Sequence, residues 1–171
     1  MKNNSTNNKI LIIGLNGSGK STLAKKLGKI LKLEVIHLDK HYFKQKWEAV
    51  SKDEWSEVIK NIISKDKWIM DGTYPSSLER RIEASNTIIF LNFNKALCLY
   101  RAFLRIFNRT QPSDKAPGNF HKISWHLVKK ILFYPKKKML ARLERHKNTK
   151  NVIVLKNDRE VERFLFVLQE E

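Results

Sequence analysis

A short stretch near the start of the chain carries the residue types needed to bind phosphate groups. Residues 14–21 read GLNGSGKS, fit the pattern G-x-x-x-x-G-K-[ST] in full, and hold three of the six glycines of the chain. In this pattern the glycines let backbone N–H groups turn inward around oxygen anions, the lysine reaches the β and γ phosphates, and the hydroxyl ligates Mg²⁺. The residues predicted to form this cradle are Gly14, Asn16, Gly17, Ser18, Gly19, Lys20, Ser21 and Thr22.

The residues on either side of the stretch support this interpretation. The apolar run 9–14 precedes it and is typical of a buried strand, while residues 20–32 place leucines and isoleucines on one helical face. The N-terminus of that helix would add unpaired N–H groups and the positive end of its dipole. The sequence therefore predicts that a nucleoside triphosphate binds here; whether its γ-phosphoryl group is transferred or hydrolysed is a separate question.

Two carboxylates follow predicted strands and are candidates for the chemistry. Asp39 ends the run LEVIHLD and Asp71 ends the run KWIMD. Ligands of open parallel sheets sit beyond the carboxyl ends of the strands, where phosphoryl transfer needs a metal and a residue that orients the nucleophile. A helix-capping or turn role is the alternative for both residues. His37, two residues before Asp39 on the same predicted strand face, either contacts ligand or packs in the core.

Three arginines at a spacing of four form a further candidate group. Arg101, Arg105 and Arg109 share one face of a predicted helix, and Arg109 enters a proline-containing loop. Such a row can stabilise the charge that moves during phosphoryl transfer. An exposed basic helix face is the alternative interpretation.

These residues require an alternation of strands and helices to hold them. Strands are predicted at 9–14, 33–39, 67–72, 86–93 and 151–156. Helices are predicted at 20–32, 51–65, 74–85, 95–108, 123–147 and 158–171, with a loop at 109–120. Ser51 and Glu54 form a capping box, Pro135 kinks or breaks the long helix, and Asn157 or Asp158 caps the last. Apolar strands without alternation indicate a parallel sheet covered on both faces, in a single domain over 1–171.

The charge of the chain is large and uneven. Lysine and arginine number 34 against 17 aspartate and glutamate, and residues 95–150 hold 15 of the basic and 2 of the acidic residues. This segment thus carries +13 of the net +17 and favours a polyanionic partner: nucleotide phosphates, nucleic acid or an anionic membrane. A solvated lysine-rich surface explains it equally well. Aromatic residues are not interleaved with the lysines of 134–147 as a single-strand stacking platform would need.

The composition also excludes several classes of protein. The single cysteine, Cys98, excludes an internal disulfide framework or a four-cysteine zinc site and, in its apolar run, is expected to be buried and inert. No apolar run approaches the ~20 residues that span a bilayer. Residues 1–8 are polar and are expected to form a disordered lead-in rather than a signal peptide. A cytoplasmic location is therefore expected.

Several segments, taken in order, resemble a known family. GLNGSGKSTLAKKLG, IHLDKHYF followed by Trp47, WIMDGTYPSSLERRIEASNTIIFLNF and LYRAFLRIFNR cover most of residues 9–110. Together they are similar to adenylate-kinase-related P-loop kinases, and more closely to the "topology modulation protein" family. The resemblance implies a nucleoside-monophosphate-kinase-like α/β fold with strand order 2-3-1-4-5 flanked by helices, and a mobile lid, here residues 109–121.

The resemblance also implies a set of roles. Mg-ATP would be the phosphoryl donor, Asp71 would match the aspartate that holds metal-bound water, and Arg101 and Arg105 would match an arginine pair near adenine and the phosphates. The chain departs from the pattern at Asn92, where strand four usually ends in aspartate, and in its lid, where Arg109 is the only arginine. Ser76 stands where adenylate kinases place an arginine.

The favoured function is an ATP-dependent small-molecule kinase. Lys20, Arg105 and Arg109 would stabilise charge, Ser21 and Asp71 would hold Mg²⁺, and Asp39 would orient or deprotonate an acceptor hydroxyl, for example of a nucleoside. A nucleoside-monophosphate kinase is one alternative. An ATP-switched nucleic-acid-associated protein using segment 95–150, and a kinase of polynucleotide 5′ ends, are the others.

Overall fold

A five-stranded parallel sheet forms the centre of the molecule. In the computed structural model, which describes residues 8–44, 47–107 and 125–170, the strand order is β2-β3-β1-β4-β5. This is the α/β order predicted from the sequence. The strands are β1 Lys9–Gly14, β2 Val35–His37, β3 Trp68–Asp71, β4 Thr87–Leu91 and β5 Asn151–Leu155.

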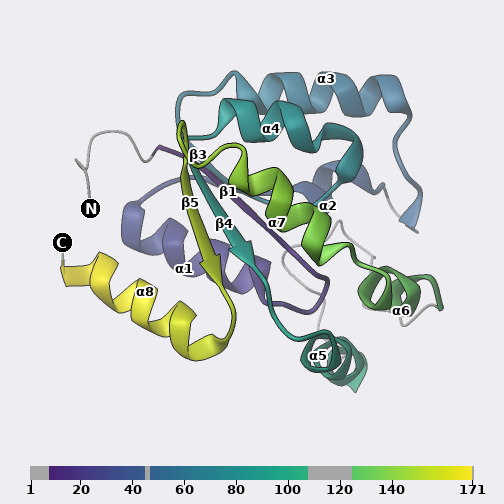
Figure 1. Cartoon of the computed structure of the whole chain (residues 1–171). Helices are drawn as coiled ribbons and strands as arrows, with labels where there is room; N and C mark the ends of the chain where they lie inside the picture. The colour runs from purple at the N-terminus through teal and green to yellow at the C-terminus, as the bar shows by residue number, and fades with distance from the viewer. Residues whose placement is uncertain (1–7, 45–46, 108–124, 171) are drawn as a thin grey trace.

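Helices cover both faces of this sheet, as Figure 1 shows. Apolar side chains of α3, α4 and α7 pack on one face, and those of α1, α5, α6 and α8 pack on the other. The central strands β1, β3 and β4 are buried on both faces, which explains their unbroken apolar runs. The helices are α1 Lys20–Leu31, α2 Leu38–Tyr42, α3 Lys52–Ile63, η2 Pro75–Ser77, α4 Leu78–Ala84, α5 Lys95–Phe107, α6 Trp125–Leu132, α7 Lys136–Glu144 and α8 Asp158–Glu170.

Most of the local signals read from the sequence are confirmed. The Ser51 hydroxyl accepts from the Glu54 N–H and the Glu54 carboxylate accepts from the Ser51 N–H, so the capping box forms at the start of α3. Pro135 separates α6 from α7, as expected of a proline within a helical pattern. Asn157, not Asp158, caps α8, because its side-chain oxygen accepts from the N–H of Glu160.

One predicted boundary is wrong in a way that affects the site. The strand predicted over 33–39 ends at His37, and residues Leu38–Tyr42 form the short helix α2. Asp39 therefore lies on the first turn of a helix and does not share a strand face with His37. The run LEVIHLD misleads because its apolar residues fit a strand, while the buried Leu38 packs in the core as a helical residue.

Two predicted segments fall outside the described residues. These are most of the lead-in over 1–8 and the lid over 109–121, which includes Arg109. Within the described ranges, no helix has both the length and the apolar character that crossing a membrane requires.

Candidate functional site

The loop between β1 and α1 is closed by hydrogen bonds to one carbonyl group. The oxygen of Leu15 accepts from the Ser18 N–H at 3.2 Å, from the Ser18 hydroxyl at 2.8 Å and from the Lys20 ammonium at 2.8 Å. Leu15 itself is buried in the core. Ser18 therefore shapes the loop from within, and the Lys20 side chain lies back over it.

Two glycines of this loop are required for different reasons. Gly17 has φ +86°, and a Cβ atom on it would lie 2.2 Å from the carbonyl oxygen of Cys98 in α5. Gly19 has φ +90° at the N-cap of α1, and a Cβ there would contact nothing within 4 Å. The backbone thus packs tightly against α5 on one side and is open at the helix N-terminus.

The open side of the loop is suited to an anion. The first turn of α1 contains no acidic residue, so no side chain of that turn offsets the positive end of the helix dipole. Asn16 and Thr22 are exposed, and Lys20 and Ser21 are half-buried. The predicted cradle residues therefore surround the N-terminus of α1.

The carboxyl ends of β2 and β3 are joined by a buried pair. His37 and Asp71 occupy paired positions in the two strands. The His37 Nδ1 atom lies 2.7 Å from Asp71 Oδ1, and the two side chains are 8% and 6% exposed. This partnership fixes one oxygen of the Asp71 carboxylate. The sequence offered His37 as a residue that contacts ligand or packs; its hydrogen bond to Asp71 is a third role that strand spacing alone does not reveal.

Asp39 reaches the same edge of the sheet from α2. Its Oδ1 atom accepts a hydrogen bond from the hydroxyl of Tyr74, in the loop after β3. Burial raises the pKa of the Tyr74 hydroxyl, so this group stays protonated and acts as a donor. Asp39 is thus held from one side while it remains partly accessible.

The loop after β3 is also bound to the phosphate-binding loop. The Thr73 hydroxyl donates to the carbonyl oxygen of Gly14 at 2.8 Å and accepts from the N–H of Gly14 at 3.3 Å. One side chain therefore fixes both polar groups of the residue that begins the loop. The two loops are therefore linked directly by hydrogen bonds.

A buried arginine holds the loop after β3 from within the core. Arg81 on α4 has no exposed surface, yet its guanidinium donates to the carbonyl oxygens of Gly72 at 2.7 Å, Thr73 at 2.7 Å and Tyr74 at 2.8 Å. Its Nε also donates to Ser77. The sequence contained a signal for this inward position, because residue 81 follows Leu78 by three and so lies on the buried face of α4.

Arg101 of α5 is paired with an acidic residue of another helix. The Arg101 guanidinium lies 2.5 Å from Asp158 Oδ2 at the start of α8, and its Cζ lies 5.5 Å from the centre of the Phe93 ring. Arg105 is half-buried further along α5. The predicted contacts of Arg101 and Arg105 with nucleotide, and those of Arg109, stay predictions.

Asn92 follows β4, at the position where the resemblance described above leads one to expect an aspartate. Its N–H donates to the carbonyl oxygen of Leu155 at 2.8 Å, and its side-chain oxygen is buried and makes no hydrogen bond within the described part of the chain. Cys98, one turn into α5, is buried as expected, and burial raises the pKa of its thiol. An inert thiol follows from that shift.

One protein-family model matches the part of the chain that contains the G-x-x-x-x-G-K-[ST] stretch. A model of the ATPase family associated with various cellular activities (AAA) matches residues 10–92, a little under half of the chain. This region runs from β1 through the end of β4 and contains every site residue placed above except those of α5. No curated protein sequence gives a significant match.

Solved structures share the fold over nearly the whole chain at low identity. A shikimate kinase from Acinetobacter baumannii in complex with shikimate has a TM-score of 0.58 and 15% identity, covering 96% of this chain and 94% of that one. A shikimate kinase from Bacteroides thetaiotaomicron has a TM-score of 0.52 and 17% identity, with 94% and 95% covered. A gluconokinase from Sinorhizobium meliloti 1021 has a TM-score of 0.53 and 14% identity, with 96% and 94% covered. The chain is therefore a P-loop α/β domain with a kinase-like fold, which implies that it binds a nucleotide.

Proposed function

We propose that this protein transfers the γ-phosphoryl group of Mg-ATP to a hydroxyl group of a small molecule. The observation that carries the proposal is the meeting of two groups at one edge of the sheet. The phosphate-binding loop ends β1, and the pairs His37–Asp71 and Tyr74–Asp39 end the neighbouring strands β3 and β2. A nucleotide cradle with carboxylates beside it is the arrangement that phosphoryl transfer needs.

The nucleotide side of the reaction relies on fixed positive groups. The amides of residues 14–22 would bind the phosphates, and Lys20 would move from the Leu15 carbonyl to the β and γ phosphates. Arg101, Arg105 and Arg109 would approach from α5 and beyond it. These groups would stabilise charge on the γ-phosphoryl oxygens as the bond to the leaving ADP breaks.

The donor set fits magnesium held mainly by phosphate and water. Within the described ranges no three histidine, cysteine or acidic side chains come together as a metal cage. Mg²⁺ in phosphoryl-transfer sites usually takes only one or two protein ligands, and the Ser21 hydroxyl with Asp71, through water, would supply them. When bound, the ion would neutralise negative charge on the phosphates.

Asp39 is the proposed base on the acceptor side. It would accept the proton of the acceptor hydroxyl while that oxygen forms its bond to phosphorus and ADP departs. Tyr74 would keep the carboxylate oriented toward the acceptor. The fold neighbours named as shikimate kinase and gluconokinase support a small-molecule acceptor, and the resemblance to topology modulation proteins supports the kinase class.

The arginines nearest Pro75 argue against a nucleoside-monophosphate acceptor. Arg81 is committed to backbone carbonyls, and the Arg80 guanidinium donates to the Ser56 hydroxyl at 3.0 Å, on the exposed side of α4. Neither is placed as an adenylate kinase places its phosphate-binding arginine. A hydroxyl acceptor is therefore favoured over a phosphate acceptor.

A turnover screen tests the proposal. ADP release from Mg-ATP would be measured with nucleosides, nucleoside monophosphates, sugars, hydroxy acids and oligonucleotides. We expect a hydroxyl compound to give the highest turnover, and we expect Asp39→Asn to lower kcat by ~10²–10⁴-fold with ATP affinity unchanged. Preference for a nucleoside monophosphate, together with wild-type kcat in Asp39→Asn, would contradict the assignment.

A second candidate function, an ATP-switched nucleic-acid-associated protein, has one specific observation in its favour. Aromatic side chains are exposed on the surface of the basic segment 95–150. Trp125 is 69% exposed and Phe133 is 78% exposed, at the two ends of α6. The Lys129 ammonium lies 5.8 Å from the centre of the Trp125 ring. Binding of an oligonucleotide that weakens steeply with salt, as log Kd against log salt, would favour this function or a polynucleotide 5′-kinase.

A further inference from the structure

The loop after β3 points its carbonyl groups into the core and its amides outward. Arg81 binds the carbonyl oxygens of Gly72, Thr73 and Tyr74 in turn. The peptide bonds are all trans, and in a trans peptide the N–H points opposite to the C=O. The N–H groups of Thr73 and Tyr74 therefore both point away from Arg81.

These two amides have no acceptor in the described part of the chain. Neither donates a hydrogen bond to any atom of the residues that the structure describes, whereas the N–H of Gly72 bonds to Ile12. Arg81 has no exposed surface, but Thr73 and Tyr74 are only half-buried. Thr73 and Tyr74 therefore keep some accessible surface, and their N–H groups are two donors without an acceptor among the described residues.

The shape of the loop is unusual and is maintained by Arg81. Gly72 has φ +135° and Tyr74 has φ +23°, a region that costs a non-glycine residue of order 1–3 kcal/mol. Such a conformation persists only where its surroundings enforce it, and three hydrogen bonds to one planar guanidinium do so here. Successive backbone N–H groups in a turn can form anion-binding nests.

Electrostatics add to this preference for an anion. Among the described residues, no carboxylate lies within ion-pair distance of Arg81. Burial lowers the pKa of Arg81 to about 9, so the side chain carries its charge near neutral pH without a counter-ion. The carbonyl oxygens of the loop face this cation, and the N–H groups lie on the opposite side. The charge of Arg81 therefore adds to the positive potential of the N–H groups.

The neighbours of the loop indicate which ligand would bring the anion. Thr73 is hydrogen-bonded to Gly14 at the start of the nucleotide cradle, and the hydroxyl of Tyr74 contacts Asp39, the proposed base. A molecule bound at Asp39 would therefore be separated from the Tyr74 amide by about the length of the Tyr74 side chain. The nucleotide phosphates have their own amides in residues 14–22, so the amides of 73 and 74 are left for the acceptor.

We propose that the Thr73 and Tyr74 amides bind an anionic oxygen of the acceptor, which is therefore a hydroxyl compound that also carries a carboxylate or phosphate group. This inference rests on the proposed function, because it assigns the anion to the acceptor of that reaction. Arg81 acts as a positioning residue, since it touches only the loop and not the ligand.

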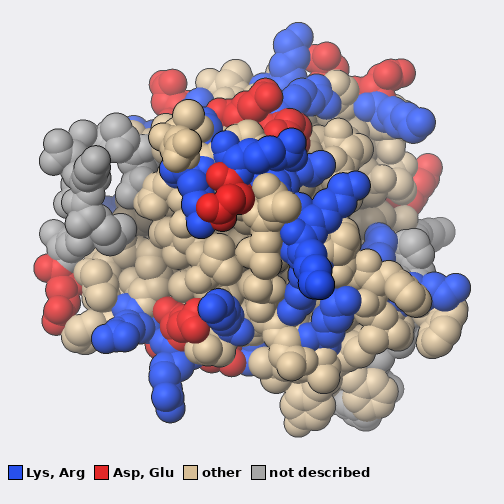
Figure 2. Space-filling model, in the orientation of Figure 1, with Lys and Arg blue, Asp and Glu red and all other residues tan. Residues whose placement is uncertain are grey.

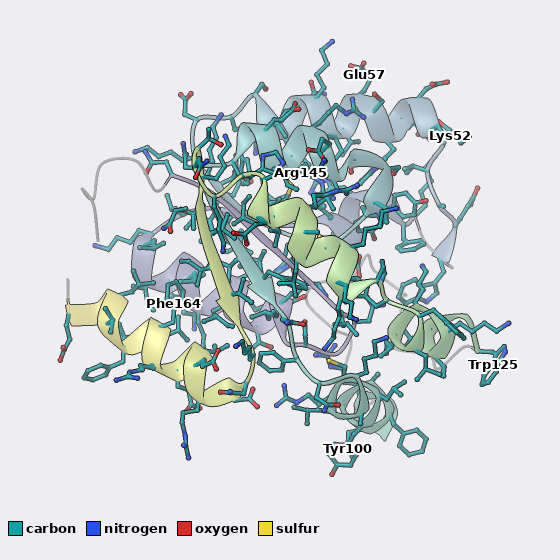
Figure 3. All side chains as sticks on the ribbon, in the orientation of Figure 1. Lys52, Glu57, Tyr100, Trp125, Arg145 and Phe164 are labelled. Carbon is teal, nitrogen blue, oxygen red and sulfur yellow. The ribbon has the colours of Figure 1, made fainter. Side chains whose placement is uncertain are left out.

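Amide NMR on protein labelled with ¹⁵N at threonine and tyrosine tests the site directly. The protein would be saturated with Mg-ADP, so that the nucleotide cradle is filled, and titrated with inorganic phosphate or acetate at constant ionic strength. We expect a saturable downfield shift of the Thr73 and Tyr74 amide protons and no shift at Tyr100, on the distant face of α5 (Figure 3). Absence of a saturable shift at residues 73 and 74 overturns the proposal.

A matched pair of variants on α4 separates positioning from charge. Arg81→Lys keeps the positive charge but cannot hold three carbonyls, and should weaken anion binding at Thr73 by about tenfold or more. Arg80→Lys changes the neighbouring exposed arginine, which does not touch the loop, and should leave that affinity within about twofold. If Arg81→Lys does not fold, the wild-type titration decides alone.

The acceptor screen then tests the anion site separately from the proposed kinase function. A shift with phosphate alone indicates a phosphate-bearing acceptor, and a shift with acetate indicates an acid. Turnover that prefers neutral polyols over their acidic or phosphorylated counterparts overturns the inference and leaves the kinase assignment standing. Saturable shifts without phosphoryl transfer to any hydroxyl compound overturn the function, and with it the assignment of this anion site to an acceptor.

Discussion

Two parts of the molecule carry polar groups, and they hold them in opposite ways. The strand-end edge, formed by residues 14–22 and by the ends of β2 and β3 through residue 74, holds its groups by buried hydrogen bonds. The basic corner, formed by α5, α6 and the start of α8, displays them on the surface. Figure 3 shows Tyr100 and Trp125 of this corner projecting away from the sheet.

The two parts differ in the exposed fraction of their ion-paired side chains. At the strand-end edge, the His37–Asp71 pair is 8% and 6% exposed. At the basic corner, the Arg101–Asp158 pair is 28% and 57% exposed, although its atoms are just as close. Figure 2 shows lysine and arginine gathered beyond this corner, over α7. A buried, hydrogen-bonded pair such as His37–Asp71 cannot reorganise cheaply and suits catalysis, whereas solvated charges can exchange partners at little cost.

The largest effect of a substitution at the strand-end edge is expected at Lys20. Lys20→Ala removes the ammonium proposed to stabilise the γ-phosphoryl group, so turnover should fall by about 10³-fold. The melting temperature should change little, because the side chain is only half-buried and bonds to a carbonyl that Ser18 also satisfies. Steady-state ADP release and thermal unfolding measure the two effects. Wild-type turnover in a folded Lys20→Ala protein would remove the basis for assigning the nucleotide.

Two glycine substitutions compare the packed side of the cradle with its open side. Gly17→Ala forces a Cβ against the Cys98 carbonyl in addition to the unfavourable φ, and should lower the free energy of unfolding by about 2–5 kcal/mol. Gly19→Ala meets only the φ cost, about 1–2 kcal/mol. Urea unfolding of both variants measures the difference. Equal losses would mean that the contact with α5 contributes nothing.

Thr73 tests the bond between the two loops of the strand-end edge. Thr73→Val keeps the side-chain shape but leaves the N–H and C=O of Gly14 without their partner, a loss of about 1–3 kcal/mol. Thr73→Ser keeps the hydroxyl and serves as the control. Unfolding free energies and Mg-ATP affinity should fall in the valine variant and not in the serine variant.

The smallest effect is expected at the basic corner. Asp158→Asn removes the partner of Arg101 where both side chains meet solvent, so stability should change by about 1 kcal/mol or less, and less still in high salt. Thermal unfolding at two salt concentrations measures this. A loss as large as that of Thr73→Val would mean that the corner is as rigidly organised as the strand-end edge.

The sheet and the cradle were predictable because their signals are local. The unbroken apolar runs of β1, β4 and β5 fixed the strands, and residues 14–21 fixed the phosphate-binding loop. The strand order came from resemblance, since no residue pattern states which strands are neighbours. The end of β2 was misplaced because Leu38 and Asp39 fit a strand pattern and a helical turn equally well.

The partners within the site were not predictable from the sequence. His37 meets Asp71, and Tyr74 meets Asp39, across 34 and 35 residues of chain. Such pairs depend on the register of β2 against β3, which spacing along one strand does not determine. Arg81 was visible as a buried position of α4, but its three carbonyl partners depend on the shape of the loop after β3.

The close approach of Gly17 to Cys98 has a consequence for how this protein can change by mutation. Any side chain at position 17 requires α5 to retreat, and any displacement of the first turn of α5 leaves a gap behind the cradle. Position 17 and the first turn of α5 are thus coupled under selection. A substitution at one of them is tolerated only after a compensating change at the other. Functional diversification of α5 is accordingly confined to its outer face and to the residues beyond its first turns.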